Sequence, residues 1–184
     1  LMSAAEKLPV AAWTAEDYLA FEREAEIRHE WINGELFAMA GASRLHNRLA
    51  ENLSKRLSTR FEENGCETYR SDVKVQVGKN FFYPDYIVVC GEEIWEDDLL
   101  LNPTFVFEIL SDSTASRDYR IKLDAYLSLP SVQAYFILEQ STRLVRRVTR
   151  SEGGGYLVDQ YTQGALTIGS VTVDIEQLYA RVVE

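Results

Sequence analysis

The sequence predicts an α/β (α+β) fold, in which helices flank a mixed β-sheet. Apolar residues recur every four positions over residues 43–64, which indicates a helix with one buried face. Short apolar runs at 81–89, 104–110 and 132–139 are typical of strands buried in a sheet. The resulting order of helix, three strands, helix and strand favours layers of helix and sheet. No repeat and no linker rich in proline or serine divides the chain, so we expect a single domain over residues 1–184.

Capping and turn residues predict the first two elements. Thr14 and Asp17 form a capping-box pattern that opens a helix ending near residue 24. The dipeptide Asn33-Gly34 stands between apolar residues, which is the strongest short signal for a β-hairpin. We expect that hairpin over residues 30–40.

The remaining elements follow from apolar runs between turn residues. Ser43 is expected to cap the long helix and Gly65 to end it. The buried stripe of this helix consists of Leu45, Leu49, Leu53, Leu57 and Phe61. The later elements are strands at 67–77 and 81–89, an acidic loop at 92–98, a strand at 104–110, a helix from Ser113 or Ser116 to about residue 129, a strand at 132–139, a hairpin of 143–150 and 156–161, a strand near 167–173 and a short C-terminal helix.

Composition restricts the class of protein. The net charge of −10 argues against a general polyanion binder, because nucleic-acid affinity comes largely from Lys and Arg. The charge is unevenly spread: residues 42–60 carry +4, residues 143–150 carry four arginines, and residues 92–98 carry five acids. No run approaches the roughly 20 apolar residues of a membrane span, and no signal peptide is visible. We therefore expect a cytoplasmic protein that does not bind a membrane.

The two cysteines give no disulfide or zinc signal. Cys66 and Cys90 are far apart, and no C-x-x-C motif is present, which argues against a disulfide scaffold and a zinc ribbon. Cys90 ends an apolar run, so we interpret it as a small core residue.

Two acidic residues belong to successive predicted core strands. Asp85 follows Pro84 at the start of one strand, and Glu108 lies inside the next. A carboxylate in such a strand is costly unless it is paired or binds a cation. Because adjacent strands lie only about 4.8 Å apart, both carboxylates could hold one divalent ion, and hard oxygen ligands suit Mg²⁺ or Mn²⁺. The alternatives are a buried salt bridge with an arginine or a carboxylate at a mouth facing water.

Lys122 is a candidate for the lysine that metal-dependent nucleases often carry two residues after the strand glutamate. That position is Leu110 here, on the same strand face as Glu108. Lys122 lies on the following helix, where it shares a face with Asp118 and Tyr126 at i, i+4 spacing. The alternative is an ordinary surface ion pair between Asp118 and Lys122.

The other candidate site residues are histidines and carboxylates near turns and helix ends. His46 is offset from the centre of the apolar stripe, so it either faces a cleft or is structural or exposed. Glu30 and Glu35 flank the Asn-Gly turn, and either adds a third carboxylate to the site or is solvated; Asp72 has the same ambiguity. His29 carries no spacing signal, and we expect it at the surface. No phosphate-binding loop, nucleophile elbow or H-E-x-x-H motif is present.

Taken in order, these motifs resemble the PD-(D/E)XK restriction-endonuclease-like superfamily and, more closely, the bacterial Uma-two family. The similarity covers nearly the whole chain. The segments that carry it are 14–19, 30–35, 39–41 leading to His46-Asn47, Ser71-Asp72, 83–85, 101–103, Glu108, 111–114, and the helix of Asp118, Lys122 and Tyr126. At Asp112, where many relatives have proline, this chain adds a negative charge near the site.

The resemblance implies a restriction-endonuclease-like core with a metal site at one sheet edge and hairpins at both ends. It implies a DNA endonuclease dependent on Mg²⁺ or Mn²⁺, with DNA as substrate and a homodimer among the assemblies to test. Asp85 and Glu108 would be metal ligands, with Glu35 as a third. Lys122 would replace the strand lysine, and His46 would stand at the mouth of the cleft as a further catalytic residue.

Two other functions remain open from the sequence. The first is a non-catalytic module that keeps the nuclease fold and binds nucleic acid or a protein. The absent lysine at residue 110 and the negative net charge favour it. The second is a hydrolase that uses Asp85 and Glu108 as an acid/base pair on another substrate, although no aromatic platform for a sugar can be located.

Overall fold

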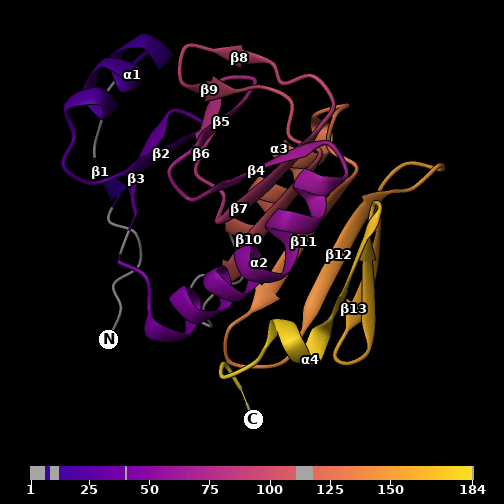
Figure 1. Ribbon diagram of the computed structural model, residues 1–184. Coiled ribbons are helices and arrows are strands. Elements are labelled where there is room, and N and C mark those ends of the chain that lie inside the picture. The colour runs from indigo at the N-terminus through magenta and orange to yellow at the C-terminus, as the bar shows by residue number, and fades with distance from the viewer. Residues whose placement is uncertain (1–6, 9–12, 40, 111–117, 184) are drawn as a thin grey trace.

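The computed structural model describes residues 7–8, 13–39, 41–110 and 118–183, which form two large β-sheets, a separate hairpin and four helices (Figure 1). Sheet A has the spatial order β1 (Lys7–Leu8), β3 (Glu35–Ala38), β2 (His29–Ile32), β6 (Asn80–Phe82), β5 (Lys74–Val77), β9 (Leu99–Leu100) and β8 (Trp95–Glu96). Sheet B has the order β13 (Tyr156–Tyr161), β12 (Val145–Arg150), β11 (Ala134–Glu139), β10 (Phe105–Leu110), β7 (Tyr86–Cys90) and β4 (Cys66–Arg70). The hairpin is β14 (Ala165–Ile168) and β15 (Val171–Asp174), and the helices are α1 (Ala15–Glu24), α2 (Arg44–Glu63), α3 (Asp118–Ser128) and α4 (Ile175–Leu178).

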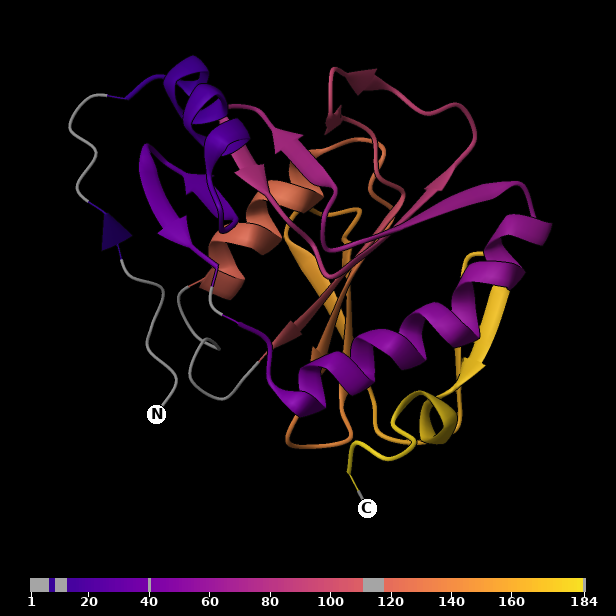
Figure 2. The ribbon, with the colours of Figure 1, turned by 60° about the vertical axis from the view of Figure 1, so that its left-hand side comes forward.

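Sheet B separates two apolar cores, and the alternation of β10 supplies residues to both. Figure 2 shows α2 and α3 on opposite sides of this sheet. Phe105, Phe107 and Ile109 pack toward α2, α4 and the β14–β15 hairpin. Val106 and Leu110 pack in the other core, with α3 and sheet A. The mixed helix-and-sheet class predicted from the sequence is therefore confirmed. The same alternation turns Glu108, which lies between Phe107 and Ile109, toward α3.

Local sequence signals set the ends of the first helices as predicted. Thr14 and Asp17 form the capping box of α1, with the Asp17 backbone N–H donating to Thr14 Oγ1 over 3.2 Å. Asn33 and Gly34 adopt positive φ angles of 53° and 82° between β2 and β3, as a two-residue hairpin turn requires. Ser43 caps α2, accepting a hydrogen bond from the backbone N–H of residue 46 over 3.0 Å.

The strands predicted at 67–77 and 81–89 each divide in two. β4 continues into β5, and β6 continues into β7, so residues 66–90 form one long hairpin whose base belongs to sheet B and whose tip belongs to sheet A. The break before β7 falls at Pro84, which has no N–H to donate to a ladder. Alternation and apolar content persist through such a bend, so they do not reveal it.

Two other sequence expectations change, and a third stays a prediction. The loop at 92–98 contains the two-residue strand β8, and the strand expected near 167–173 is the hairpin β14–β15, which turns at Gly169 with φ +57°. The Gly-Ser dipeptide at 169–170 was a turn signal for that hairpin. The cap expected at Ser113 or Ser116 lies outside the described residues, which resume at the start of α3.

The prediction that Cys66 and Cys90 are unpaired is wrong. The two residues are direct partners in the antiparallel ladder of β4 and β7, and they form a disulfide across the base of the long hairpin. Cys90 is exposed and not a core residue. The spacing of 24 residues carried no signal, because the pairing arises from strand register alone.

No helix in the described part of the chain combines the length and apolar character needed to cross a membrane.

We expect the disulfide to stabilise the fold by about 3 kcal/mol, because it closes a loop of 24 residues in the unfolded chain. Urea unfolding should show a lower midpoint for Cys66→Ser/Cys90→Ser than for the oxidised wild type. Reductant should bring the wild type to the midpoint of the variant. Equal midpoints for the oxidised and the reduced protein would contradict the expectation.

Candidate active site

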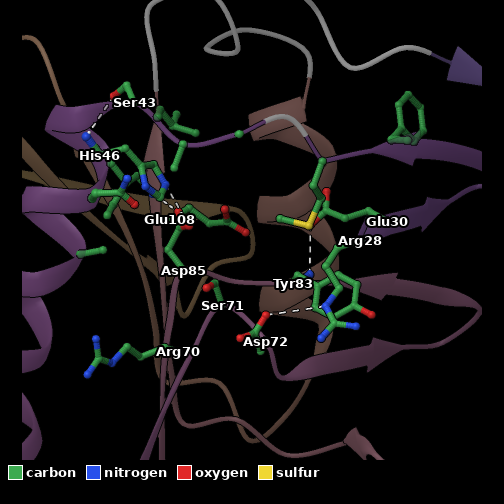
Figure 3. A pocket seen from close by; sticks show the side chains of 18 of the residues that line it. Arg28, Glu30, Ser43, His46, Arg70, Ser71, Asp72, Tyr83, Asp85 and Glu108 are labelled. Atoms are coloured by element: carbon green, nitrogen blue, oxygen red, sulfur yellow. Dashed lines mark hydrogen bonds and ion pairs between the residues drawn. The ribbon is translucent and has the colours of Figure 1, made fainter. Parts of the chain in front are cut away.

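One cavity of about 1100 Å³ brings together four of the residues singled out from the sequence: His46, Asp85, Glu108 and Lys122 (Figure 3). It lies where the 66–90 hairpin bends from sheet B to sheet A, so the residues at both bends, 70–72 and 83–85, contribute to its lining. The first turns of α2 line one side, and residues 25–28 with parts of β2 and β3 line another.

The end of a strand ladder positions Asp85. The pairing of β7 with β10 stops at Tyr86 and Phe107, so Asp85 stands beside Glu108 at the next step. There, the Asp85 side chain takes the place of a backbone acceptor. Its Oδ2 accepts a hydrogen bond from the backbone N–H of Ile109 over 2.7 Å. The carboxylate is thereby fixed against the strand that carries Glu108.

The first turn of α2 brings His46 onto the same carboxylate, and the two side chains point toward one another in Figure 3. His46 Nε2 lies 2.9 Å from Asp85 Oδ1. Burial lowers the pKa of His46, whereas the hydrogen bond to Asp85 and the charges of Asp85 and Glu108 raise it. The outcome is a pKa above the ordinary value. No described residue forms a hydrogen bond with its other ring nitrogen, Nδ1, which is buried.

Lys122 of α3 links two carboxylates from different sheets. Its Nζ lies 3.0 Å from Glu108 Oε1 on β10 and 2.9 Å from Glu30 Oε1 on β2. All three side chains are 12% exposed or less. Tyr126, one turn along α3, donates to Glu108 Oε1 over 3.2 Å, and the backbone N–H of Tyr83 donates to Glu30 Oε1 over 3.1 Å. The surface pair of Asp118 and Lys122 considered from the sequence does not account for these contacts.

Burial, more than any neighbouring charge, determines the pKa of Glu108. Burial raises its pKa, as do the charges of Asp85 and Glu30, whereas Lys122 lowers it. The result is about 8, against 4.5 for an ordinary glutamate. The pKa of Lys122 is lowered by burial but raised more by Glu108 and Glu30, so this lysine stays charged. A full negative charge on Glu108 therefore needs further cationic compensation.

The donor set fits a hard divalent cation. Asp85 and Glu108 provide adjacent carboxylates, and Mg²⁺ commonly binds one or two carboxylates and keeps several waters. Acidic side chains outnumber basic ones six to three in the lining. Within the described residues, no group of three or more His, Cys, Asp or Glu side chains could hold one ion. The protein ligands would thus be the two carboxylates, completed by water.

The structure brings Glu30, and not Glu35, to this group. Glu35 is the register partner of Ile32 and stands beside the turn, whereas Glu30 pairs with Phe37 further along the hairpin. Opposite residues of an antiparallel pair share a face, so Glu35 lies on the correct face but toward the turn. The cavity is lined by Glu30, Ile32 and Phe37. Strand alternation could not separate the two glutamates, because only the position of the cavity along the hairpin distinguishes them.

His29 is buried, so the prediction that it lies at the surface is wrong. Its backbone N–H donates to Glu22 Oε1 over 2.9 Å, and its Nδ1 lies 3.1 Å from Glu22 Oε2. Tyr83 also donates to Glu22 Oε1, over 3.0 Å. This cluster ties α1 to the start of β2 and so supports the strand that carries Glu30. Asp72, in contrast, is exposed at the rim and lies 3.6 Å from Arg28.

The structure describes no side-chain contact for two further residues named from the sequence. The side chain of Asp118 and the whole of Asp112 lie outside the described residues.

Replacing Glu108 should flatten the pH dependence of stability. The folded-state pKa of about 8 lies above the unfolded value of 4.5, so the stabilisation is complete below pH 4.5 and is lost as pH rises toward 8. The free energy of unfolding of the wild type should fall by up to about 1.4 kcal/mol per pH unit in this window relative to Glu108→Gln. Urea unfolding at several pH values measures the slopes, with the exposed Glu63→Gln as control. Parallel curves for wild type and Glu108→Gln would refute the assignment.

Removing the Lys122 ammonium should strongly destabilise the fold. In Lys122→Met, two buried carboxylates lose their shared cation, and we expect a loss of about 3 kcal/mol in the free energy of unfolding. The double variant Lys122→Met/Glu108→Gln should recover part of the loss, because one uncompensated charge is gone. The exposed Lys79→Met should change stability by less than about 0.5 kcal/mol. A single variant as stable as the control would exclude a buried charge network.

Comparisons with known proteins agree with the resemblance found in the sequence. A family model described as "Uma2: Putative restriction endonuclease" matches residues 15–178. The uncharacterised proteins sll1609 and slr1290 of Synechocystis sp. are 35% identical over 132 residues and 27% identical over 156 residues. The first alignment covers 69% of this chain and 75% of the relative, and the second covers 83% and 82%.

A solved structure shares the fold. It is described as a putative nuclease belonging to DUF820 from Anabaena variabilis, and it matches with a TM-score of 0.77 at 14% identity. The match covers 92% of this chain and 98% of that one. At this identity, the likeness speaks for the fold alone. The family model, by contrast, covers most of the chain, and the protein therefore belongs to the Uma2 family.

Proposed function

We propose that this protein is a divalent-metal-dependent endonuclease that hydrolyses DNA phosphodiester bonds at Asp85 and Glu108. The observation that carries the proposal is the meeting of His46, Asp85, Glu108 and Lys122, from four separate elements or their ends, in one cavity. The description of the Uma2 family as restriction endonucleases supports the same reaction and DNA as the substrate.

Asp85 and Glu108 would hold the ion, either Mg²⁺ or Mn²⁺. When bound, such an ion lowers the pKa of a coordinated water and neutralises charge on the scissile phosphate. Glu108 is suited to this role because burial raises its pKa although Lys122 lies beside it, so a further cation would stabilise its ionised form. Asp85 is suited because its carboxylate is held in one orientation by Ile109 and His46.

Lys122 would orient the attacking water or stabilise the charge that develops on the phosphate. The described contacts use two of its three N–H donors, on Glu30 and Glu108. One donor thus has no partner among the described contacts, and Lys122 lines the cavity. In this arrangement Glu30 is a positioning residue, because it acts by fixing the Lys122 ammonium between the two sheets.

His46 would position the Asp85 carboxylate and add positive charge to the cavity. Its Nε2 lies within hydrogen-bond distance of the Asp85 carboxylate. Because its pKa is raised, a larger fraction of the imidazole is protonated near neutral pH than for an exposed histidine. A positive charge there would favour an incoming phosphate.

One observation favours a second function, a non-catalytic binding module that retains the fold. Lys122 is already paired with two carboxylates, and Leu110 occupies the position of the usual strand lysine. Under this alternative the buried charges serve stability alone, and the protein binds nucleic acid or a partner without cleaving it.

A cleavage assay with metal titration separates the two functions. Wild-type protein with Mg²⁺ or Mn²⁺ should cut plasmid or single-stranded DNA, and chelation should stop it. Asp85→Asn and Glu108→Gln should each lower the rate by at least about 100-fold. Asp72→Asn, an isosteric change at the rim of the same cavity, should retain the rate.

Calorimetry completes this test. Wild type should bind Mn²⁺, and Asp85→Asn/Glu108→Gln should not. If the wild type cuts no faster than the double variant and takes up no metal, the nuclease proposal fails. DNA or partner binding in that case would support the non-catalytic module.

A further inference from the structure

We propose that the DNA substrate binds as a single strand, whose phosphates beside the scissile bond lie along the outer face of α2 on Arg44, Arg48 and Lys55. The inference rests on the proposed function, because it places the strand at the cavity of Asp85 and Glu108. It adds a substrate class and a binding surface to that site.

The three basic residues form one ridge on α2. At 3.6 residues per turn, the spacings of four and eleven positions place Arg44, Arg48 and Lys55 within about 40° of one another around the helix axis. All three are exposed, and none forms an ion pair with another described residue. The buried stripe of Leu49, Leu53, Leu57 and Phe61 occupies the opposite side of the helix. The ridge therefore presents unpaired positive charge to solvent.

The ridge adjoins the rim of the cavity. Glu51 lines the cavity and lies within about 60° of each ridge residue around the helix. Its own charge is offset by Arg70, whose Nη1 lies 3.4 Å from Glu51 Oε2. Arg70 also lines the cavity, so the Arg70–Glu51 ion pair, and not an unpaired charge, joins α2 to the mouth. From Arg44 to Lys55 the ridge extends about 16 Å along the axis, enough for several phosphates of one strand.

The opposite rim does not suit a second strand. It presents the exposed acids Glu26 and Asp72, and Arg28 there is already paired with Asp72 at 3.6 Å. In B-form DNA the two phosphate backbones flank grooves of only about 6 and 12 Å. A duplex with one strand on the ridge would bring its other backbone toward these carboxylates. The charge asymmetry of the two rims therefore favours one strand.

The depth of the site supports the same conclusion. The side chains of Asp85 and Glu108 are 10% and 7% exposed, so a scissile phosphate must enter the cavity to reach them. A flexible single strand can turn one phosphate inward while its neighbours stay on a charged track, which is how single-strand grooves work. A paired backbone has less freedom to do so.

The other arginine-rich segment does not offer an equivalent surface. Arg147 of β12 pairs with Asp159 at 2.7 Å, and Arg146 pairs with Glu139. Arg150 donates to the backbone oxygens of Leu127, Leu129 and Val132 at the end of α3. These guanidinium groups are occupied by the fold itself, unlike those of the α2 ridge.

Binding of a labelled oligonucleotide, measured by fluorescence anisotropy in EDTA, tests the proposal. Wild type should bind the single strand at least about tenfold more tightly than the matched duplex. Arg48→Glu/Lys55→Glu should weaken single-strand binding at least about tenfold. It should also reduce the slope of log affinity against log salt by about 1.4, or about 0.7 for each lost phosphate contact.

A control variant separates the effect of the ridge on DNA binding from the effect of net charge. Arg56→Glu/Lys79→Glu makes the same change in total charge, but Arg56 lies beside Lys55 on a different flank of α2 and Lys79 lies in the β5–β6 turn. This control should alter binding by less than about twofold. All four residues are exposed, so both variants should keep the unfolding midpoint of the wild type.

The outcomes separate this inference from the proposed function. Equal affinity for single strand and duplex, or equal loss in the ridge and control variants, would overturn the single-strand ridge even if the wild type cleaves DNA. Single-strand binding that depends on the ridge, without metal-dependent cleavage by the wild type, would support the binding surface and overturn the nuclease.

Discussion

The Lys122 ammonium adds an ionic link between parts of this molecule that otherwise meet through apolar packing, the Tyr126–Glu108 hydrogen bond and the 66–90 hairpin. It contacts Glu108 on β10 and Glu30 on β2, so one buried cation joins α3, sheet B and sheet A. Either carboxylate alone would be costly at this depth. Loss of the cation would destabilise the fold, because removing one partner of a buried ion pair leaves the other charge buried and uncompensated. Burial is the main reason that the pKa of Glu108 is raised, and Lys122 offsets this effect only in part.

The long hairpin of residues 66–90 explains why these charges meet. Its bend at Pro84 ends the pairing with β10 one step early and frees Asp85 to stand beside Glu108. The disulfide of Cys66 and Cys90 closes the base of the same hairpin. Residues at both bends of this hairpin therefore line the cavity, from the buried Asp85 to the exposed Asp72.

Much of this arrangement could be predicted from the sequence, and the rest depended on tertiary register. The four-residue period of α2 and the Asn33-Gly34 turn are local signals, and each predicted its element correctly. The acids in apolar strands are local signals too, and the structure brings Asp85 and Glu108 together in one cavity. The choice of Glu30 over Glu35, the burial of His29 and the disulfide are not local, because each depends on which residues lie opposite one another across elements. The division of two strands between sheets was hidden for the same reason, since each half is assigned to its sheet by its pairing partner.

The bend of the hairpin has a consequence for how such a protein can diverge. Asp85 and Glu108 stand on or beside sheet B, and Lys122 and His46 lie on α3 and α2, which pack on its two faces. Residues 25–39, which form the facing wall, belong to sheet A or the segments around it. The wall can therefore change in sequence and contour while His46, Asp85, Glu108 and Lys122 keep their frame, provided that the carboxylate at position 30 remains. A single bent hairpin thus lets the two sides of the cavity vary independently of one another.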